Sequence, residues 1–169
     1  DKLEHRGAVS SDGKTGDGAG ILIEIPHDFL VTQCDFVLPE LHKYAVGMVF
    51  LPKKENQRTY CIGVLENEIK NQGLEILGWR KVPVNHEVVG NIAALTEPHI
   101  MQIFVGRGSG DLSDHEFNIK LYCSRKIAEH TISDSKLSQS SYFYLPSLST
   151  HTLIYKGCLL YTSDAADEE

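Results

Sequence analysis

Cysteine is scarce in this sequence: four residues in 169, with no CxxC pair and no histidine at zinc-ligand spacing. The absence of that spacing excludes the usual structural zinc sites. So few cysteines in so long a chain also exclude a small disulfide-stapled scaffold. We therefore expect reduced, mostly buried thiols, as in a cytoplasmic protein, and neither a metal nor a cofactor bound by this chain.

Long hydrophobic runs and clusters of positive charge are missing as well. No apolar run approaches the roughly 20 residues that a membrane span needs. Lys and Arg number 16 against 23 Asp and Glu, which gives a formal net charge of −7, and the basic residues are scattered. A nucleic-acid surface needs clustered Lys and Arg. The sequence therefore predicts a soluble protein whose partners include neither a membrane nor a nucleic acid.

The length suits one domain, but the two ends of the chain stand apart from the rest. The first residues, DKLEHRGAV, carry no signal-peptide pattern and resemble the interior of a longer protein. Residues 158–169, CLLYTSDAADEE, resemble the translation of a sequencing adapter. We expect residues 1–157 to be a partial domain and residues 158–169 to be a non-native, disordered tail; a natural acidic tail is the alternative.

Glycine is concentrated in residues 12–20, DGKTGDGAG. A phosphate-binding P-loop requires G-x-x-x-x-G-K-[ST], and Ala8 stands where its first glycine would be. A dinucleotide-binding fingerprint must open a helix, whereas this segment precedes a predicted strand. Turns shaped by glycine are the simplest interpretation. A module that binds an anion or a nucleotide through this loop is an alternative hypothesis.

Apolar and β-branched runs predict strands at 21–25, 44–51, 74–84, 100–105, 142–145 and 152–155. The first of these is expected to be buried. The second is apolar on both faces, as in the interior of a layered fold. The last two are predicted to form a hairpin-like pair that bends at Pro146 and Ser147.

Two amphipathic helices are predicted. In residues 58–72 the apolar side chains recur every three or four positions, and Gly73 ends the pattern. The second helix begins with the Ser113–Glu116 capping box. Its inner face is predicted to consist of Phe117, Leu121, Ser124 and Ala128. Strands and helices are interleaved irregularly, so the pattern predicts an α+β domain.

Two further groups of residues are candidates for function. His99 and Met101 share one face of a predicted strand, which favours packing over ligand binding. Lys53, Lys54 and Arg58 form a small basic patch at the entrance to the first predicted helix. A solvated helix entrance explains this patch as well as a binding partner does.

Several motifs in a fixed order resemble one family. HRGA at residues 5–8 and TGDGAGIL at residues 15–22 look like the early part of the glutaminase domain of glutamate synthase large subunits. YAVGMVFLP, GLEILGWRKVPV, TEP and YKG follow in the order in which that domain carries similar stretches. The resemblance covers residues 1–157.

The resemblance implies an N-terminal-nucleophile hydrolase of the class II glutamine amidotransferase type, with a four-layer α-β-β-α sandwich. In that family an N-terminal cysteine attacks the side-chain amide of glutamine, with its own α-amino group as base. Ammonia leaves, and hydrolysis of the thioester gives glutamate. The ammonia then reaches a synthase domain that carries FMN and an iron–sulfur cluster and aminates 2-oxoglutarate reductively.

The implied partners are glutamine, the synthase domain of the same parent chain and a small reductase subunit. The electrons come from a nicotinamide nucleotide or from ferredoxin. The implied location is the bacterial cytoplasm, or a plastid for a plant or algal protein.

The resemblance also implies site residues. Arg6 matches the arginine beside the nucleophile, where a guanidinium can orient neighbouring groups. Residues expected to bind substrate or to shape the site are His5, Gly7, Asp17 and Gly18. The nucleophile and the Asn-Gly pair of the oxyanion hole would lie outside the printed residues, so we expect this chain to be inactive by itself. A catalytically silent assembly domain is a third hypothesis.

Overall fold

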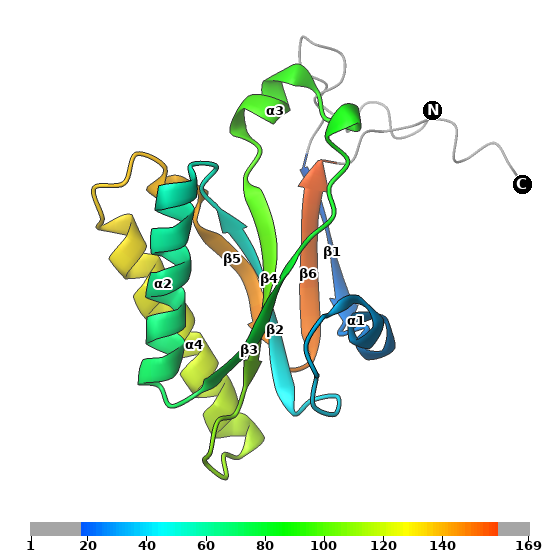
Figure 1. Ribbon diagram of the computed structural model, residues 1–169, viewed down its shortest axis with the longest axis vertical. Helices are drawn as coiled ribbons and strands as arrows, with labels where there is room; N and C mark the ends of the chain where they lie inside the picture. Colours follow the sequence, from blue (N-terminus) through cyan, green and yellow to red (C-terminus); the bar gives the residue numbers. More distant parts are fainter. Residues whose placement is uncertain (1–17, 159–169) are drawn as a thin grey trace, which may run out of the picture. The chain divides into compact units, whose positions relative to one another are not determined.

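The computed structural model describes residues 18–158 (Figure 1). The elements are, in chain order, β1 (Gly18–Glu24), α1 (His27–Gln33), β2 (Tyr44–Leu51), α2 (Glu55–Asn71), β3 (Glu75–Lys81), η2 (His86–Val88), α3 (Asn91–Thr96), β4 (His99–Gly106), α4 (Asp114–Ser133), η3 (Ser140–Tyr142), β5 (Tyr144–Ser149) and β6 (Thr152–Cys158). Most of them belong to one compact unit, Leu22–Val82 with Pro98–Tyr155. Among the described residues, a second unit holds residues 18–21, the segment Pro83–Glu97 and residues 156–158.

A four-stranded antiparallel sheet with the order β3-β4-β2-β5 forms the centre of the larger unit. Seven of the eight residues of β2 are buried, which confirms the prediction of a strand that is apolar on both faces. Because side chains alternate along a strand, β2 serves two cores at once. Its odd-numbered residues Ala45 and Val49 face one core, and its even-numbered residues Val46 and Met48 face the other.

Helices α2 and α4 cover one face of this sheet (Figure 1). The predicted inner face of α4 is confirmed, because Phe117, Leu121, Ser124 and Ala128 are all buried. The capping box is present as well: Ser113 Oγ accepts a hydrogen bond from the Glu116 amide, and the Glu116 carboxylate accepts one from the Ser113 amide.

Helix α2 ends at the glycine that the sequence indicated. Gly73 has a φ of 75°, a left-handed conformation that glycine adopts at little cost. The Leu74 amide donates to the Ile69 carbonyl and the Gly73 amide donates to the Lys70 carbonyl. These two bonds form a Schellman motif, which satisfies carbonyls that the end of a helix leaves unpaired.

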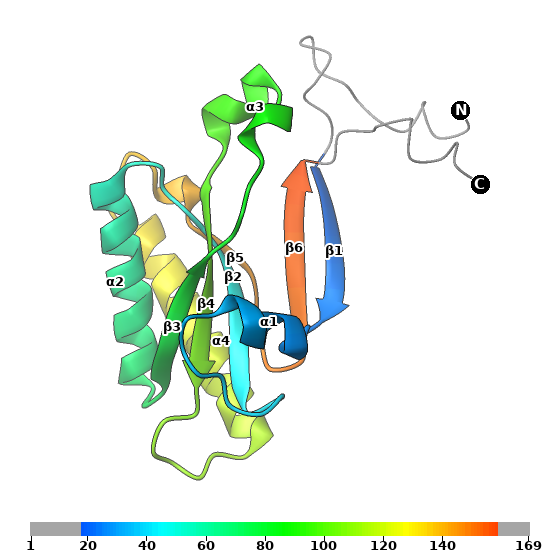
Figure 2. The same ribbon diagram turned by 45° about the vertical axis from the view of Figure 1, so that its right-hand side comes forward.

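The other face of the four-stranded sheet packs against a second apolar cluster. Its buried members are Ile25, Leu30, Tyr44, Val46, Met48, Phe104 and Leu153. They come from the sheet, from α1, from the residue that follows β1 and from β6. Strands β1 and β6 form a separate two-stranded sheet and run side by side in opposite directions (Figure 2).

Strand β1 is present, but the prediction that it is buried is wrong. Ile21 and Leu22 are 59% and 63% exposed. The physical reason is that β1 has only one neighbouring strand, β6, within the described range 18–158. Burial begins after the strand, where Ile25 is 3% exposed.

The prediction of a hairpin between the last two strands is wrong in its pairing and in its bend. Strand β5 pairs with β2 in the four-stranded sheet, whereas β6 pairs with β1. Pro146 and Ser147 lie inside β5, and the chain turns at Thr150 and His151 instead. A proline is accommodated there because β5 is an edge strand and its register with β2 shifts between Met48 and Phe50.

Two connections contain elements that periodicity did not predict. Helix α1 lies in the connection from His27 to Lys43, and the segment Pro83–Glu97 holds η2 and the short helix α3. These helices have three to seven residues, too few to show a period. The coarse prediction of an α+β domain is confirmed by the antiparallel sheets and the helices described above.

Candidate functional site

The sequence-predicted site falls almost entirely outside the described residues. Gly18 is the exception, and it is the first residue of β1. The positions outside are His5, Arg6, Gly7 and Asp17. The last residues of the glycine-rich segment lead into a strand, as the sequence predicted. A phosphate held by that segment would therefore have no helix N-terminus immediately behind it, which is the feature that P-loops and dinucleotide folds share.

A partly buried chain of hydrogen bonds joins the two sheets, and we call it the inter-sheet bridge; its residues are Arg80, Gln102 and Tyr155. Gln102 lies in β4 and is completely buried. Its Oε1 accepts a hydrogen bond from Arg80 Nη1 at 2.9 Å. Its Nε2 donates to Tyr155 Oη at 3.1 Å. Both ends of the amide are therefore satisfied, as a buried polar group requires.

The guanidinium of Arg80 also contacts α1. Its central carbon lies 5.6 Å from the centroid of the Phe29 ring, within the range of a cation–π interaction. Its positive charge acts on the thiol of Cys34, the residue that caps α1. Burial raises the pKa of Cys34, Arg80 lowers it in part, and the net shift is upward.

A second polar contact in the same layer joins His27 to Tyr44. His27 Nδ1 and Tyr44 Oη lie 3.0 Å apart and are hydrogen-bonded. Burial, followed by the charge of a Cys34 thiolate, raises the pKa of Tyr44 to about 12. Both Tyr44 and Cys34 therefore stay protonated at neutral pH. This environment favours fixed hydrogen bonds over nucleophilic or acid–base chemistry at these two groups.

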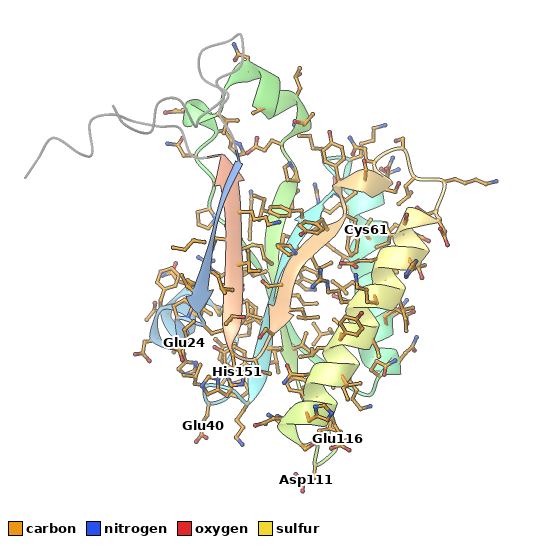
Figure 3. All side chains as sticks on the ribbon, turned by 180° about the vertical axis from the view of Figure 1, so that it is seen from behind. Glu24, Glu40, Cys61, Asp111, Glu116 and His151 are labelled. Atoms are coloured by element: carbon orange, nitrogen blue, oxygen red, sulfur yellow. The ribbon has the colours of Figure 1, made fainter. Side chains whose placement is uncertain are left out.

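The other described cysteine thiols offer no better nucleophile. Cys61, labelled on α2 in Figure 3, is completely buried, and burial raises its pKa to about 11. Cys123 is half-buried on α4. The predicted helical positions of these two residues are confirmed, and the thiols of Cys34, Cys61 and Cys123 are free. Each of the three cysteines lies inside the chain, with no α-amino group beside its thiol.

His99 lies in β4 near two cations. Burial lowers its pKa first, and the charges of Arg58 and Lys81 lower it further. Its imidazole is therefore held in the neutral form. Met101, two residues further along the same strand, packs against the core beneath α2 and α4. Within residues 18–158, no group of three or more His, Cys, Asp or Glu residues is placed to hold a metal ion.

Sequence reasoning did not single out the inter-sheet bridge. One signal for it was available, because Gln102 interrupts the apolar strand Ile100–Val105 with a polar side chain. Such a residue is either exposed or satisfied by buried partners. Arg80 and Tyr155 are 22 and 53 residues away in the chain. The pairing of β3 with β4 places Arg80 opposite Gln102, and the packing of one sheet on the other identifies Tyr155 as the second partner.

Comparison with known proteins gives a family and a set of relatives. The family model of the class-II glutamine amidotransferases matches residues 1–165. The NADPH glutamate synthase large chain of Bacillus subtilis is 41% identical over 175 residues, which cover 99% of this chain and 11% of that protein. The corresponding large chain of Azospirillum brasilense is 41% identical, over 92% of this chain and 10% of that protein.

The relatives include a plant protein. The ferredoxin-dependent glutamate synthase 1 of Arabidopsis thaliana is 38% identical, over 93% of this chain and 10% of its own length. The chain thus spans about a tenth of the length of these relatives. None of the helices within the described residues is both long enough and apolar enough to cross a bilayer.

Proposed function

The chain belongs to the class-II glutamine amidotransferase family, and we propose that it is part of the glutaminase domain of a glutamate synthase large chain. This domain would hydrolyse glutamine to glutamate and ammonia. The observation that carries the proposal is identity of 36–41% to eight glutamate synthases along more than nine-tenths of the chain. The ammonia would serve the reductive amination of 2-oxoglutarate in a synthase domain.

We propose the four-layer α-β-β-α sandwich for the complete domain. Three layers of such a sandwich have counterparts among the described residues: the pair α2 and α4, the four-stranded sheet, and the sheet of β1 and β6. The exposed side chain of Leu22 on β1 supports a further layer or strand on that side. Residues 1–157 would form the domain, with residues 158–169 as a non-native tail.

Arg6 is proposed to lie beside the nucleophile, as its match to the family motif implies. An arginine there would orient neighbouring groups through its fork of N–H donors without changing its own charge. The residues proposed to bind substrate or to shape the loop around it are His5, Gly7, Asp17 and Gly18. The position of Gly18 at the beginning of β1 supports this, because a sheet end can present a loop to a substrate rigidly.

The nucleophile is proposed to be an N-terminal cysteine that is not among the printed residues. The mechanism needs a thiol next to a free α-amino group, which acts as the base. Cys34, Cys61 and Cys123 lack that neighbour, and burial raises the pKa of the first two thiols. Cys158 is the last residue of β6. We therefore expect the printed chain alone not to hydrolyse glutamine.

Other parts of the longer parent protein would supply the redox chemistry of glutamate synthesis. FMN and an iron–sulfur cluster are proposed for the synthase part and a small reductase subunit for electron delivery. The described residues do not fit an iron–sulfur cluster, because no three His, Cys, Asp or Glu side chains in residues 18–158 converge. The parent is proposed to work in the bacterial cytoplasm, or in a plastid if it comes from a plant or alga.

The test uses the uninterrupted gene product that contains this chain. We expect it to release ammonia from glutamine and the 169-residue chain to release none. Arg6→Lys should lower kcat about tenfold or more, because a lysine cannot reproduce the guanidinium fork. Arg125→Lys, on α4 and paired with Glu129, is the matched control and should leave kcat unchanged.

Two results would contradict the proposal. A complete gene product without glutaminase activity would favour a catalytically silent assembly domain. Saturable binding of ATP, NADH or phosphate to the 169-residue chain would favour the alternative of an anion- or nucleotide-binding loop. The strand that begins at Gly18 argues against that alternative, because no helix dipole would face the anion.

A further inference from the structure

The inter-sheet bridge occupies a central position in the larger unit. Gln102 lies in β4, paired with Met48 of β2 on one side and with Arg80 of β3 on the other. The side-chain amide of Gln102 donates a hydrogen bond to the hydroxyl of Tyr155 in β6. The bridge therefore fixes a residue of the small sheet relative to the middle of the large one.

We propose that the inter-sheet bridge is a positioning device for glutamine hydrolysis and that Gln102 and Tyr155 are its positioning residues. This inference rests on the proposed function. Neither residue needs to touch the substrate. The bridge acts by holding β6, which is the hydrogen-bonded neighbour of β1.

Apolar contacts of Ile23 and Leu153 also attach the small sheet to the large one. Leu153 of β6 is completely buried, but Leu22 and Glu24 of β1 are exposed. Two further hydrogen bonds join β6 to β5 of the large sheet: the Ile154 amide donates to Ser147 Oγ at 3.1 Å, and the Thr152 amide donates to Ser149 Oγ at 3.3 Å. Two consecutive residues of β6, Ile154 and Tyr155, are thus held from two different strands.

Such a bridge fixes the position of one sheet relative to the other, rather than adding to the stability of the fold. A well-packed apolar pair would fill the same space without the cost of burying the Gln102 amide. Apolar contacts are also non-directional, so two faces joined by them alone can slide. A hydrogen bond is directional, and a buried amide whose two ends are both hydrogen-bonded specifies one arrangement of its partners. The two ends of the Gln102 amide therefore set the place of Tyr155 relative to Arg80.

The position of β6 matters for catalysis because β6 pairs with β1, and β1 includes a residue of the proposed site. β1 begins at Gly18, one of the residues proposed to shape the site. A displacement of about 1 Å in a catalytic group can cost about a hundredfold in rate. A small shift of β6 would pass to β1 through their shared hydrogen bonds. Such a shift should lower kcat without removing any group that binds glutamine.

The experiment uses the complete gene product and compares glutamine-dependent with ammonia-dependent glutamate formation. Tyr155→Phe keeps the ring and removes the hydroxyl; Gln102→Met keeps the length and removes the amide. Gln102→Glu is the conservative rescue, since a carboxylate can accept hydrogen bonds from both Arg80 and the Tyr155 hydroxyl. Tyr122→Phe, on α4 and 61% exposed, is the matched control.

For Tyr155→Phe and Gln102→Met we expect kcat with glutamine to fall about tenfold or more, with KM changed less than about twofold. Ammonia-dependent glutamate formation should not change, because external ammonia bypasses the glutaminase site. Gln102→Glu and Tyr122→Phe should keep most of the glutamine-dependent kcat.

A different pattern would overturn the inference. If Tyr155→Phe and Gln102→Met lower the melting temperature while kcat with glutamine stays at the unmodified value, the bridge only stabilises the fold. If Gln102→Met does not fold, Tyr155→Phe decides, because it preserves the packing of the ring. An unmodified protein that forms glutamate from ammonia but not from glutamine would refute the proposed function, and the inference with it.

Discussion

At the scale of single residues, two glycines with left-handed backbone meet where α2 ends and the loop after β4 begins. Gly73 and Gly108 have φ values of 75° and 72°. A Cβ atom on Gly108 would lie 2.3 Å from the Gly73 carbonyl oxygen, closer than any side chain can approach. Both the backbone conformation and the space therefore require glycine at position 108.

Gly108→Ala should lower the free energy of unfolding by about 1–3 kcal/mol, since it adds a strained φ and a clash with a backbone atom. Gly63→Ala is the matched control, because a Cβ at this position of α2 meets nothing within 4 Å. That change should raise the free energy of unfolding by about 0.5–1 kcal/mol. Urea denaturation measures both. Equal effects of the two variants would contradict the structural account of Gly108.

The lowered pKa of His99 predicts how the stability of the fold depends on pH. Its folded-state pKa lies below the ordinary 6.5 because of burial and the nearby charges of Arg58 and Lys81. The unfolded chain therefore binds more protons than the folded chain below pH 6.5, and the stabilising contribution of neutral His99 is lost as pH falls toward its folded pKa. Between pH 7.5 and pH 5.5, the free energy of unfolding should therefore fall less for the His99→Gln variant than for the unmodified chain.

Urea denaturation at the two pH values measures this difference. His130→Gln, in the last turn of α4, is the control for the loss of an imidazole elsewhere. If His99→Gln and the unmodified chain lose the same stability between the two pH values, then His99 is not held neutral by its surroundings.

At the scale of elements, the ends of the long helices are defined by side-chain and backbone caps. The carboxylate of Glu116, labelled near the start of α4 in Figure 3, accepts hydrogen bonds from both the amide and the hydroxyl of Ser113. These bonds lower the pKa of Glu116, with the side-chain bond to Ser113 as the first cause. The cap therefore satisfies amides that the first turn of α4 would otherwise leave unpaired.

Ser113→Ala should lower the free energy of unfolding by about 1 kcal/mol, the usual cost of losing a helix N-cap. Ser109→Ala, in the exposed turn just before it, is the control and should change stability by less than about 0.5 kcal/mol. Thermal denaturation followed by circular dichroism compares the two. A Ser113→Ala variant as stable as Ser109→Ala would show that the cap contributes nothing to stability.

At the scale of the whole molecule, the described unit has one well-filled core and one open side. The core between α2, α4 and the four-stranded sheet contains fifteen buried apolar residues, whereas the cluster beneath the small sheet contains seven. Leu22 is 63% exposed on β1. An exposed apolar residue on a strand with an open edge favours association between chains.

Leu22→Lys should raise the monomeric fraction of the 169-residue chain in gel filtration and change its stability by less than about 0.5 kcal/mol. Leu153→Lys is the matched comparison on the neighbouring strand. Leu153 is completely buried, so a charge there should cost about 3 kcal/mol or more. An unchanged monomeric fraction for Leu22→Lys would show that this surface does not mediate association.

Much of the fold was predictable from local pattern. Strand β2 was recognisable because both of its faces are apolar, and α4 because its capping box precedes a regular apolar stripe. The short helix α1 and the segment with α3 were not, because elements of six or seven residues show too little of a period. The exposure of β1 was mispredicted, because composition does not show how many neighbours a strand has.

For the candidate site too, some residues could be predicted from the sequence and others could not. Arg6 was singled out from a motif, and its role stays a prediction because it lies outside the described residues. The inter-sheet bridge was not predicted, although Gln102 stood out as a polar residue in an apolar strand. A hydrogen-bond partner 53 residues away cannot be identified without knowing which sheets face each other.

The sequence by itself determined the family, the α+β composition and the positions of the long elements, because motifs, periodicity and capping are properties of neighbouring residues. Only the tertiary structure decided that β5 and β6 belong to different sheets, that β6 is the neighbour of β1 within residues 18–158, and that Arg80, Gln102 and Tyr155 form one bridge. Those features depend on contacts between segments far apart in the chain, and packing free energy, rather than local preference, selects them.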